Sequence, residues 1–205
     1  MQTLGNKSSF AVEYAIQNSC NAIGCVRLWI NGHFLGSLYD TIYIDGYLIG
    51  GLTEILNKNR LDERYLTSDE TTLFELLEKD LATDNERYDL ARHYAVNLGT
   101  WTDYFDVYSY RLTDTKGVIL WRFRENNGAL LDLATYPTRV FSEQFEYDEL
   151  EEVIRKVSVV LAKALEHETH TSETEKLERE NQAALQELNR ITDEQGLLSD
   201  GDRTF

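Results

Sequence analysis

Apolar and polar residues alternate along the first part of the chain. Residues 10–16 alternate and carry aromatic and β-branched side chains, which is typical of a β-strand. Residues 25–30 and 33–38 have the same character, and the Asn31-Gly32 pair lies between them. An Asn-Gly pair between two apolar runs indicates a tight hairpin, because both residues tolerate a positive φ. The pattern predicts an antiparallel three-stranded meander over residues 10–38.

Four other segments have apolar residues three and four positions apart, which is the spacing of a helix. These predicted helices cover residues 45–57, 69–81, 84–97 and 148 to about 166. The expected N-caps are Asp45 for the first, Ser68 or Asp69 for the second, and Asp148 for the fourth. The fourth helix is the most regular, because its apolar residues form one stripe: Leu150, Val153, Ile154, Val157, Val160, Leu161, Ala164 and Leu165.

Strand patterns return between the third and fourth helices. Residues 106–112 and 118–124 flank a turn in which Gly117 is expected to adopt a left-handed conformation. Residues 138–145 form another predicted strand, and Tyr136-Pro137 marks the turn that enters it. The pattern predicts an α+β fold, with a mainly antiparallel β-sheet and helices packed on it.

The composition changes near residue 168. Residues 167–172 resemble a linker. A seam with spacings of 4, 3, 4 and 3 follows, as in a coiled coil, and it consists of Leu177, Asn181, Ala184, Leu188 and Ile191. The seam covers about two heptads, so the pattern is consistent with either a short coiled coil or a partly disordered segment. We therefore predict an α+β domain over residues 1–168 and an acidic helical tail over residues 169–205.

The charge of the chain changes this picture. Acidic residues outnumber basic residues by 36 to 20, which gives a formal net charge of −16. Such a surface repels nucleic-acid backbones and anionic membranes, so neither is the expected main ligand. The surplus is concentrated in two segments: residues 61–100 hold ten acidic and four basic residues, and residues 146–205 hold sixteen and seven. A basic protein is the partner that this charge favours.

The acidic residues of the second and third predicted helices are the main candidates for contact with a partner: Asp69, Glu70, Glu75, Glu78, Asp80, Asp84, Glu86 and Asp89. A docking surface of this sign speeds encounter with a basic protein. The alternative is that these carboxylates only keep two helices soluble, since Glu is a good helix former.

A cluster of aromatic residues provides a second candidate: Trp101, Tyr104, Phe105, Tyr108 and Tyr110. Trp and Tyr dominate the energetics of protein interfaces, so Trp101 and Tyr104 are candidate partner-binding residues. The alternative is that the cluster belongs to the hydrophobic core and to the surface of a strand.

Residue patterns for catalysis and for cofactors are weak. The chain has no phosphate-binding glycine loop and no nucleophile elbow. His167 and His170 lie three residues apart, whereas a zinc-binding helix needs a spacing of four. We therefore expect no metal, no cofactor and no enzymatic activity. A site built from His93 and scattered carboxylates stays a lesser alternative. Cys20 and Cys25 are expected to be free thiols.

The first two strands and their hairpin resemble bacterial immunity proteins of immunity protein family 42. In that group, a strand with phenylalanine-alanine-x-glutamate precedes a hairpin with tryptophan-isoleucine-asparagine-glycine and a later glycine. The matching residues are Phe10, Ala11, Glu13, Trp29, Ile30, Asn31, Gly32 and Gly36. Leu28 and Leu35 depart from the pattern. The resemblance is clear over residues 8–38, weaker over residues 118–165, and does not include the tail.

The resemblance implies a non-catalytic protein that neutralises a cognate polymorphic toxin by direct binding. Such toxins belong to contact-dependent inhibition or type VI secretion systems and are often basic nucleases, which an acidic inhibitor suits. Because the sequence has no signal peptide and no membrane span, the expected location is the cytoplasm. The alternative function is a non-enzymatic adaptor that uses the C-terminal helix, through which it also forms a homo-oligomer.

Overall fold

The computed structural model describes residues 1–18, 21–67, 69–83, 89–124 and 130–195, without the side chains of residues 89, 166–177 and 192–195. The chain divides into two compact units, Met1–Ala164 and Leu165–Phe205. The first unit contains all strands of the described residues and most of their helices, so the fold is α+β as predicted. No helix in the described part of the chain is both long enough and apolar enough to span a membrane.

The first sheet is antiparallel and contains the predicted meander. It has the order β1 (Gln2–Gly5), β2 (Phe10–Asn18), β3 (Ile23–Ile30) and β4 (His33–Leu35), and β5 (Ile42–Tyr43) also pairs with β3. Asn31 and Gly32 have φ angles of 48° and 83°, which confirms the predicted hairpin. Strand β1 is an addition to the prediction, because its short sequence has no alternation that would identify it.

The second sheet has three antiparallel strands, β6 (Phe105–Arg111), β7 (Lys116–Phe123) and β8 (Val140–Glu146). The predicted hairpin is confirmed, but the predicted role of Gly117 is wrong. Gly117 lies within β7, paired with Arg111, and is absent from the glycines with a positive φ. A Cβ at this position would lie 2.2 Å from the Phe145 ring, so packing rather than turn geometry requires glycine here.

A helical segment follows β5 and covers the predicted range of residues 45–57. It begins as a π-helix, η1 (Ile44–Ile49), and continues as α1 (Gly50–Leu56). The buried positions include Leu48 and Leu52, as the spacing predicts. Asp45 is not its N-cap, because the helix begins one residue earlier and Tyr43 occupies the cap position.

The next two predicted helices have different outcomes. Helix α2 (Glu70–Ala82) is confirmed, and the Asp69 carboxylate accepts a hydrogen bond from the Thr72 N–H at 2.7 Å, as an N-cap should. Helix α3 (Asp89–Arg92) is much shorter than the predicted range of residues 84–97, of which residues 84–88 lie outside the described part. The chain leaves the helix after Arg92 because its backbone pairs with β6, where the Ser109 N–H donates to the Tyr94 carbonyl.

Short 3₁₀ helices connect these elements in the described part of the chain: η2 (Glu63–Tyr65), η4 (Thr100–Thr102) and η5 (Leu131–Leu133). The last helix, α4 (Tyr147–Gln195), begins one residue before Asp148, so Asp148 lies in its first turn and is not the N-cap that the pattern predicted. The helix also continues through residues 167–172. The predicted linker is therefore wrong. This segment has no Gly or Pro, and Ser, Thr and His cost a helix only tenths of a kcal/mol each, about 0.7 kcal/mol at most.

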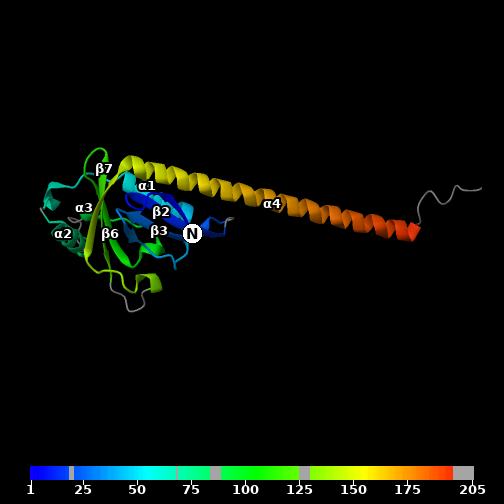
Figure 1. Cartoon of the computed structure of the whole chain (residues 1–205), viewed down its shortest axis with the longest axis horizontal. Helices are drawn as coiled ribbons and strands as arrows, with labels where there is room; N and C mark the ends of the chain where they lie inside the picture. Colours follow the sequence, from blue (N-terminus) through cyan, green and yellow to red (C-terminus); the bar gives the residue numbers. More distant parts are fainter. Residues whose placement is uncertain (19–20, 68, 84–88, 125–129, 196–205) are drawn as a thin grey trace, which may run out of the picture. The chain divides into compact units, whose positions relative to one another are not determined.

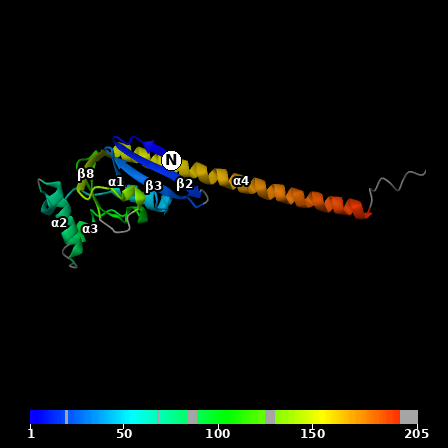
Figure 2. The ribbon, with the colours of Figure 1, turned by 60° about the horizontal axis from the view of Figure 1, so that its bottom comes forward.

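The second sheet separates two hydrophobic clusters of the first unit. Figures 1 and 2 show α2 and α3 on one side of this sheet and strands β2 and β3 on the other. On one side, Val118 and Leu120 of β7 pack with α2 and α3. On the other side, Ile119 and Trp121 pack in the larger cluster, which includes the first sheet and the beginning of α4. Period-two alternation along β7 thus places α2 on one face of the sheet and the first sheet on the other.

Candidate partner-binding surfaces

Helix α2 and its N-cap Asp69 carry five of the eight predicted acidic residues, and several of them already have partners within the chain. Glu78 forms an ion pair with Arg122 of β7. Asp80 accepts a hydrogen bond from the Tyr65 hydroxyl at 2.8 Å, and Asp69 caps the helix. Burial and the Asp80 carboxylate both raise the pKa of Tyr65, so its hydroxyl stays protonated as the donor. These three carboxylates therefore stabilise the fold in addition to contributing negative charge.

The remaining described acids of α2 are more accessible. Glu70 and Glu75 are exposed, and neither takes part in the ion pairs or side-chain hydrogen bonds of the described residues. A helix turns by about 100° per residue, so Glu78 and Asp80 flank opposite sides of the buried stripe while Glu75 points to solvent. The acidic side chains of α2 therefore do not form a single face. Asp84 and Glu86 lie outside the described residues, as does the side chain of Asp89.

A groove of about 450 Å³ lies at the N-terminal end of α2. Glu70 lines it together with Leu66 and Leu112, which are 68% and 40% exposed. The two arginines of the groove, Arg60 and Arg111, donate hydrogen bonds to groups of this chain. Exposed apolar side chains with a charged rim are typical of protein interfaces. We call this region, defined by Leu66, Glu70 and Leu112, the α2 groove.

The structure places the two aromatic candidates inside or close to the core. Trp101 is fully buried, and its indole N–H donates to the Leu98 carbonyl. Its ring is not accessible to a partner, so the prediction that Trp101 is an interface residue is wrong. Tyr104 is half-buried and packs against the same core cluster. The aromatic density near residue 101 arises from core packing.

Three exposed tyrosines are additional candidates that the sequence pattern did not identify. Tyr39, Tyr43 and Tyr47 are 61%, 47% and 48% exposed. They lie on the segment that leads from β4 into η1. Tyr is enriched at protein interfaces because it combines an apolar ring with a hydroxyl group that forms hydrogen bonds. Their four-residue spacing was visible in the sequence, but their exposure depends on how η1 packs.

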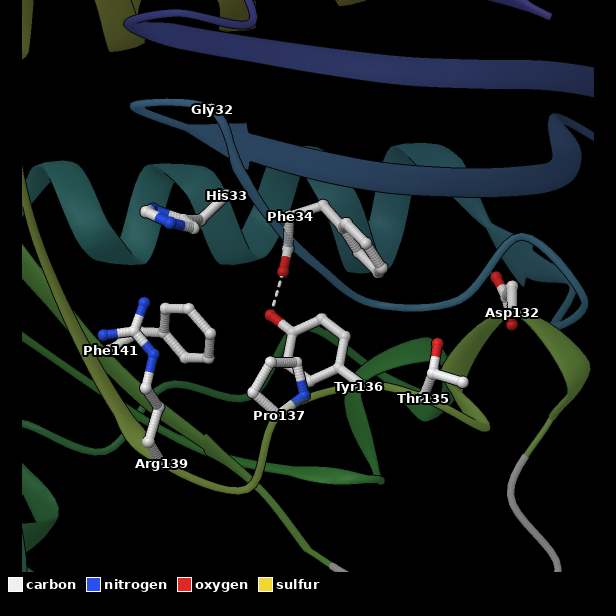
Figure 3. A pocket seen from close by; sticks show the side chains of 9 residues that line it. All are labelled: Gly32, His33, Phe34, Asp132, Thr135, Tyr136, Pro137, Arg139 and Phe141. Atoms are coloured by element: carbon white, nitrogen blue, oxygen red, sulfur yellow. Dashed lines mark hydrogen bonds between the residues drawn. The ribbon is translucent and has the colours of Figure 1, made fainter.

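A second pocket, of about 360 Å³, lies where β4 and β8 meet (Figure 3). Phe34 from β4, Tyr136 from the preceding turn and Phe141 from β8 provide an aromatic lining. Figure 3 shows Arg139 beside Phe141, at the opposite end of the pocket from Thr135. The guanidinium carbon of Arg139 lies 4.3 Å from the centroid of the Phe141 ring, within the range of a cation–π contact.

Hydrogen bonds make the aromatic lining of this pocket rigid. The Tyr136 hydroxyl donates to the Phe34 carbonyl and accepts from the Trp121 indole N–H at 2.8 Å. Burial raises the pKa of Tyr136 to about 12, so the hydroxyl remains a donor at neutral pH. The rings of Phe34 and Tyr136 meet edge to face at 4.9 Å. The two sheets are thus joined at the pocket, which is part of the folded core rather than a loose loop.

Candidates for catalysis gain no geometric support. Among the described residues, no three His, Cys, Asp or Glu side chains are grouped as metal ligands are. His93 is exposed, at the end of α3. Cys25 is a buried free thiol, and Cys20 lies outside the described residues. The surfaces described above are suited to contact with another macromolecule.

Comparisons with known proteins agree with a binding function. The family model described as immunity protein 42 matches residues 1–159. A second model, described as post-segregation antitoxin CcdA, matches residues 144–205, which is less than half of the chain. The crystal structure of CdiI from Burkholderia dolosa AUO158 is similar with a TM-score of 0.52 and 15% identity, over 77% of this chain and 99% of that one. At this identity the likeness shows the fold alone. No curated protein matches.

Proposed function

Because the chain belongs to the immunity protein 42 family, it is a toxin-neutralising immunity protein, and we propose that it acts by binding a basic toxin domain through its acidic surface. The observation that carries this proposal is the family match over residues 1–159, which spans nearly all of the first compact unit. We also propose that the system is contact-dependent inhibition; the solved structure that shares the fold is named CdiI. We propose that the protein acts in the cytoplasm and catalyses no reaction.

The α2 groove is the proposed docking surface for the toxin. Leu66 and Leu112 supply apolar area, and Glu70 supplies a carboxylate that no residue of the described chain pairs with. The exposed Glu75 of the same helix adds to the negative field. A net charge of −16 attracts a basic toxin over a distance of about one Debye length, roughly 8–10 Å at physiological salt.

The function is tested by co-expression with the toxin domain that is encoded beside the gene. We expect host cells to survive and the two proteins to purify together as a stable complex. The control is the same toxin expressed alone, which should kill the host. Death of the host in the presence of folded protein, with no complex, would show that this chain does not neutralise that toxin.

The docking surface is tested by reversing the two free acidic charges of α2. The double variant Glu70→Lys and Glu75→Lys should associate with the toxin about tenfold or more slowly at low salt, with a weaker dependence on salt. The matched control is Glu178→Lys with Glu180→Lys, which changes the net charge equally on exposed residues of α4. Stopped-flow or biolayer measurements give the association rates. Equal association rates for the two variants would show that the toxin does not bind at the α2 groove.

A second candidate function uses the C-terminal part of α4. Leu185, Leu188 and Ile191 are 62%, 65% and 42% exposed, and residues 144–205 match the antitoxin model. We propose as the alternative that this segment associates copies of the chain or binds a further protein. A chain that ends after residue 166 separates the two functions. If it is monomeric and still neutralises the toxin, the tail serves association; if it no longer neutralises, the tail belongs to the toxin-binding surface.

A further inference from the structure

The pocket between β4 and β8 contains a positively charged side chain, Arg139, that has no ion-pair partner among the described residues. Arg139 is exposed and takes part in none of the ion pairs among the described residues. Its guanidinium lies over the Phe141 ring, beside the aromatic lining of Phe34 and Tyr136. In a protein with a net charge of −16, an unpaired arginine beside an apolar pocket is an exception that needs a reason.

The carboxylates nearest to this pocket are already occupied. Asp132 accepts hydrogen bonds from Arg27 at 2.6 Å and from the Ser37 hydroxyl at 2.8 Å. Glu143 of β8 accepts from the Asn31 side chain at 3.0 Å and pairs with His33, a residue of the pocket lining, at 2.8 Å. Neither carboxylate is available to neutralise the Arg139 guanidinium. Its positive charge is therefore accessible to a partner at the pocket.

We propose that this pocket receives an aspartate or glutamate side chain of the toxin, with the carboxylate on Arg139 and the aliphatic stem against Phe34 and Tyr136. The inference rests on the proposed function and adds a specific anchor to it. A planar guanidinium binds a carboxylate through two parallel hydrogen bonds, and the aromatic walls exclude the water that would weaken them. Because the rest of the acidic surface repels carboxylates, this contact fixes the orientation of the toxin.

Two variants test the anchor in the full-length protein. Arg139→Gln removes the charge but keeps most of the side chain, and Thr135→Trp fills the other end of the pocket without changing the charge. We expect each to weaken toxin binding about tenfold or more, mainly through faster dissociation. Lys163→Gln is the matched control, because it removes one positive charge from an exposed position of α4. Circular dichroism checks that each variant is folded.

The outcomes separate this inference from the function itself. If the wild-type chain neutralises the toxin and either pocket variant binds as tightly as wild type, the anchor is wrong and the function stands. If the wild-type chain binds no toxin, the pocket is tested directly by NMR titration with phenylacetate. Saturable shifts at His33 that phenylacetamide does not produce, and that Arg139→Gln abolishes, support a carboxylate site. Absence of those shifts overturns it.

Discussion

At the residue scale, Gly36 meets two requirements at once. Its φ is +93°, a conformation that L side chains rarely adopt. A Cβ here would lie 2.0 Å from Cε3 of Trp101, which is fully buried. The glycine that follows the hairpin is therefore needed for the close approach of the Trp101 ring, and this pair connects β4 with η4.

Gly36→Ala should destabilise the protein by about 3 kcal/mol, because backbone strain and overpacking add. Gly50→Ala is the matched control, since Gly50 is helical with φ −57° and a Cβ there meets nothing within 4 Å. It should stabilise the protein by about 0.5–1 kcal/mol. Chemical denaturation measures both. Similar effects of the two substitutions would contradict the packing argument at Trp101.

At the element scale, α2 links local sequence signals with long-range contacts. Its beginning is fixed by Asp69, whose carboxylate accepts from both the backbone N–H and the hydroxyl of Thr72. These hydrogen bonds lower the pKa of Asp69. Its position on the second sheet is fixed by the Glu78–Arg122 ion pair and by buried Phe74. A sequence pattern reveals the Asp69 cap because the cap is a local signal. It does not reveal that Arg122 is the partner of Glu78.

Asp69→Ala should lower the melting temperature, because two helix donors lose their acceptor, and Asp69→Asn should restore most of the loss. Since the pKa of Asp69 is lowered in the folded state, its contribution is present above the unfolded pKa and is lost as the pH falls below about 4. Thermal melts at pH 7 and pH 3 measure this. An equal effect of Asp69→Ala at both pH values would show that the charged cap does not act as described.

At the scale of the whole molecule, the core of the first unit ends within α4. Leu150, Val153, Val157 and Leu161 are buried, and no residue of α4 beyond Leu161 is buried among those described. The first compact unit ends at Ala164. The stability of the unit therefore depends on the first four to five turns of this helix and on nothing described beyond them.

A chain that ends after residue 166 should accordingly have the same melting temperature as the full chain, within about 2 °C. Leu161→Ala in the full chain should cost about 2–5 kcal/mol, because it leaves a cavity in the core. Differential scanning calorimetry measures the stability of the shortened chain and of the Leu161→Ala variant. A large loss of stability in the shortened chain would show that the tail stabilises the first unit.

Much of this fold was accessible from the sequence because its signals are local. The Asn31-Gly32 turn, the Asp69 cap and the apolar stripe of residues 150–161 each depend on neighbours in the chain. The family resemblance over residues 8–38 also rested on one hairpin, and the immunity family match confirmed it. Where a local signal was over-interpreted, as at residues 167–172 and at Gly117, continuation of the helix or contact with a distant ring prevailed.

The sequence by itself thus determined the α+β class, the meander, the acidic charge and the family, since these follow from short-range patterns and from composition. Only the tertiary structure decided which candidate residues face solvent. It buried Trp101 against Gly36, gave Glu78 a partner in β7, and left Arg139 without an ion pair among the described residues, beside an aromatic pocket. These outcomes depend on contacts between segments that lie 44 to 110 residues apart, because packing of two sheets brings those segments together.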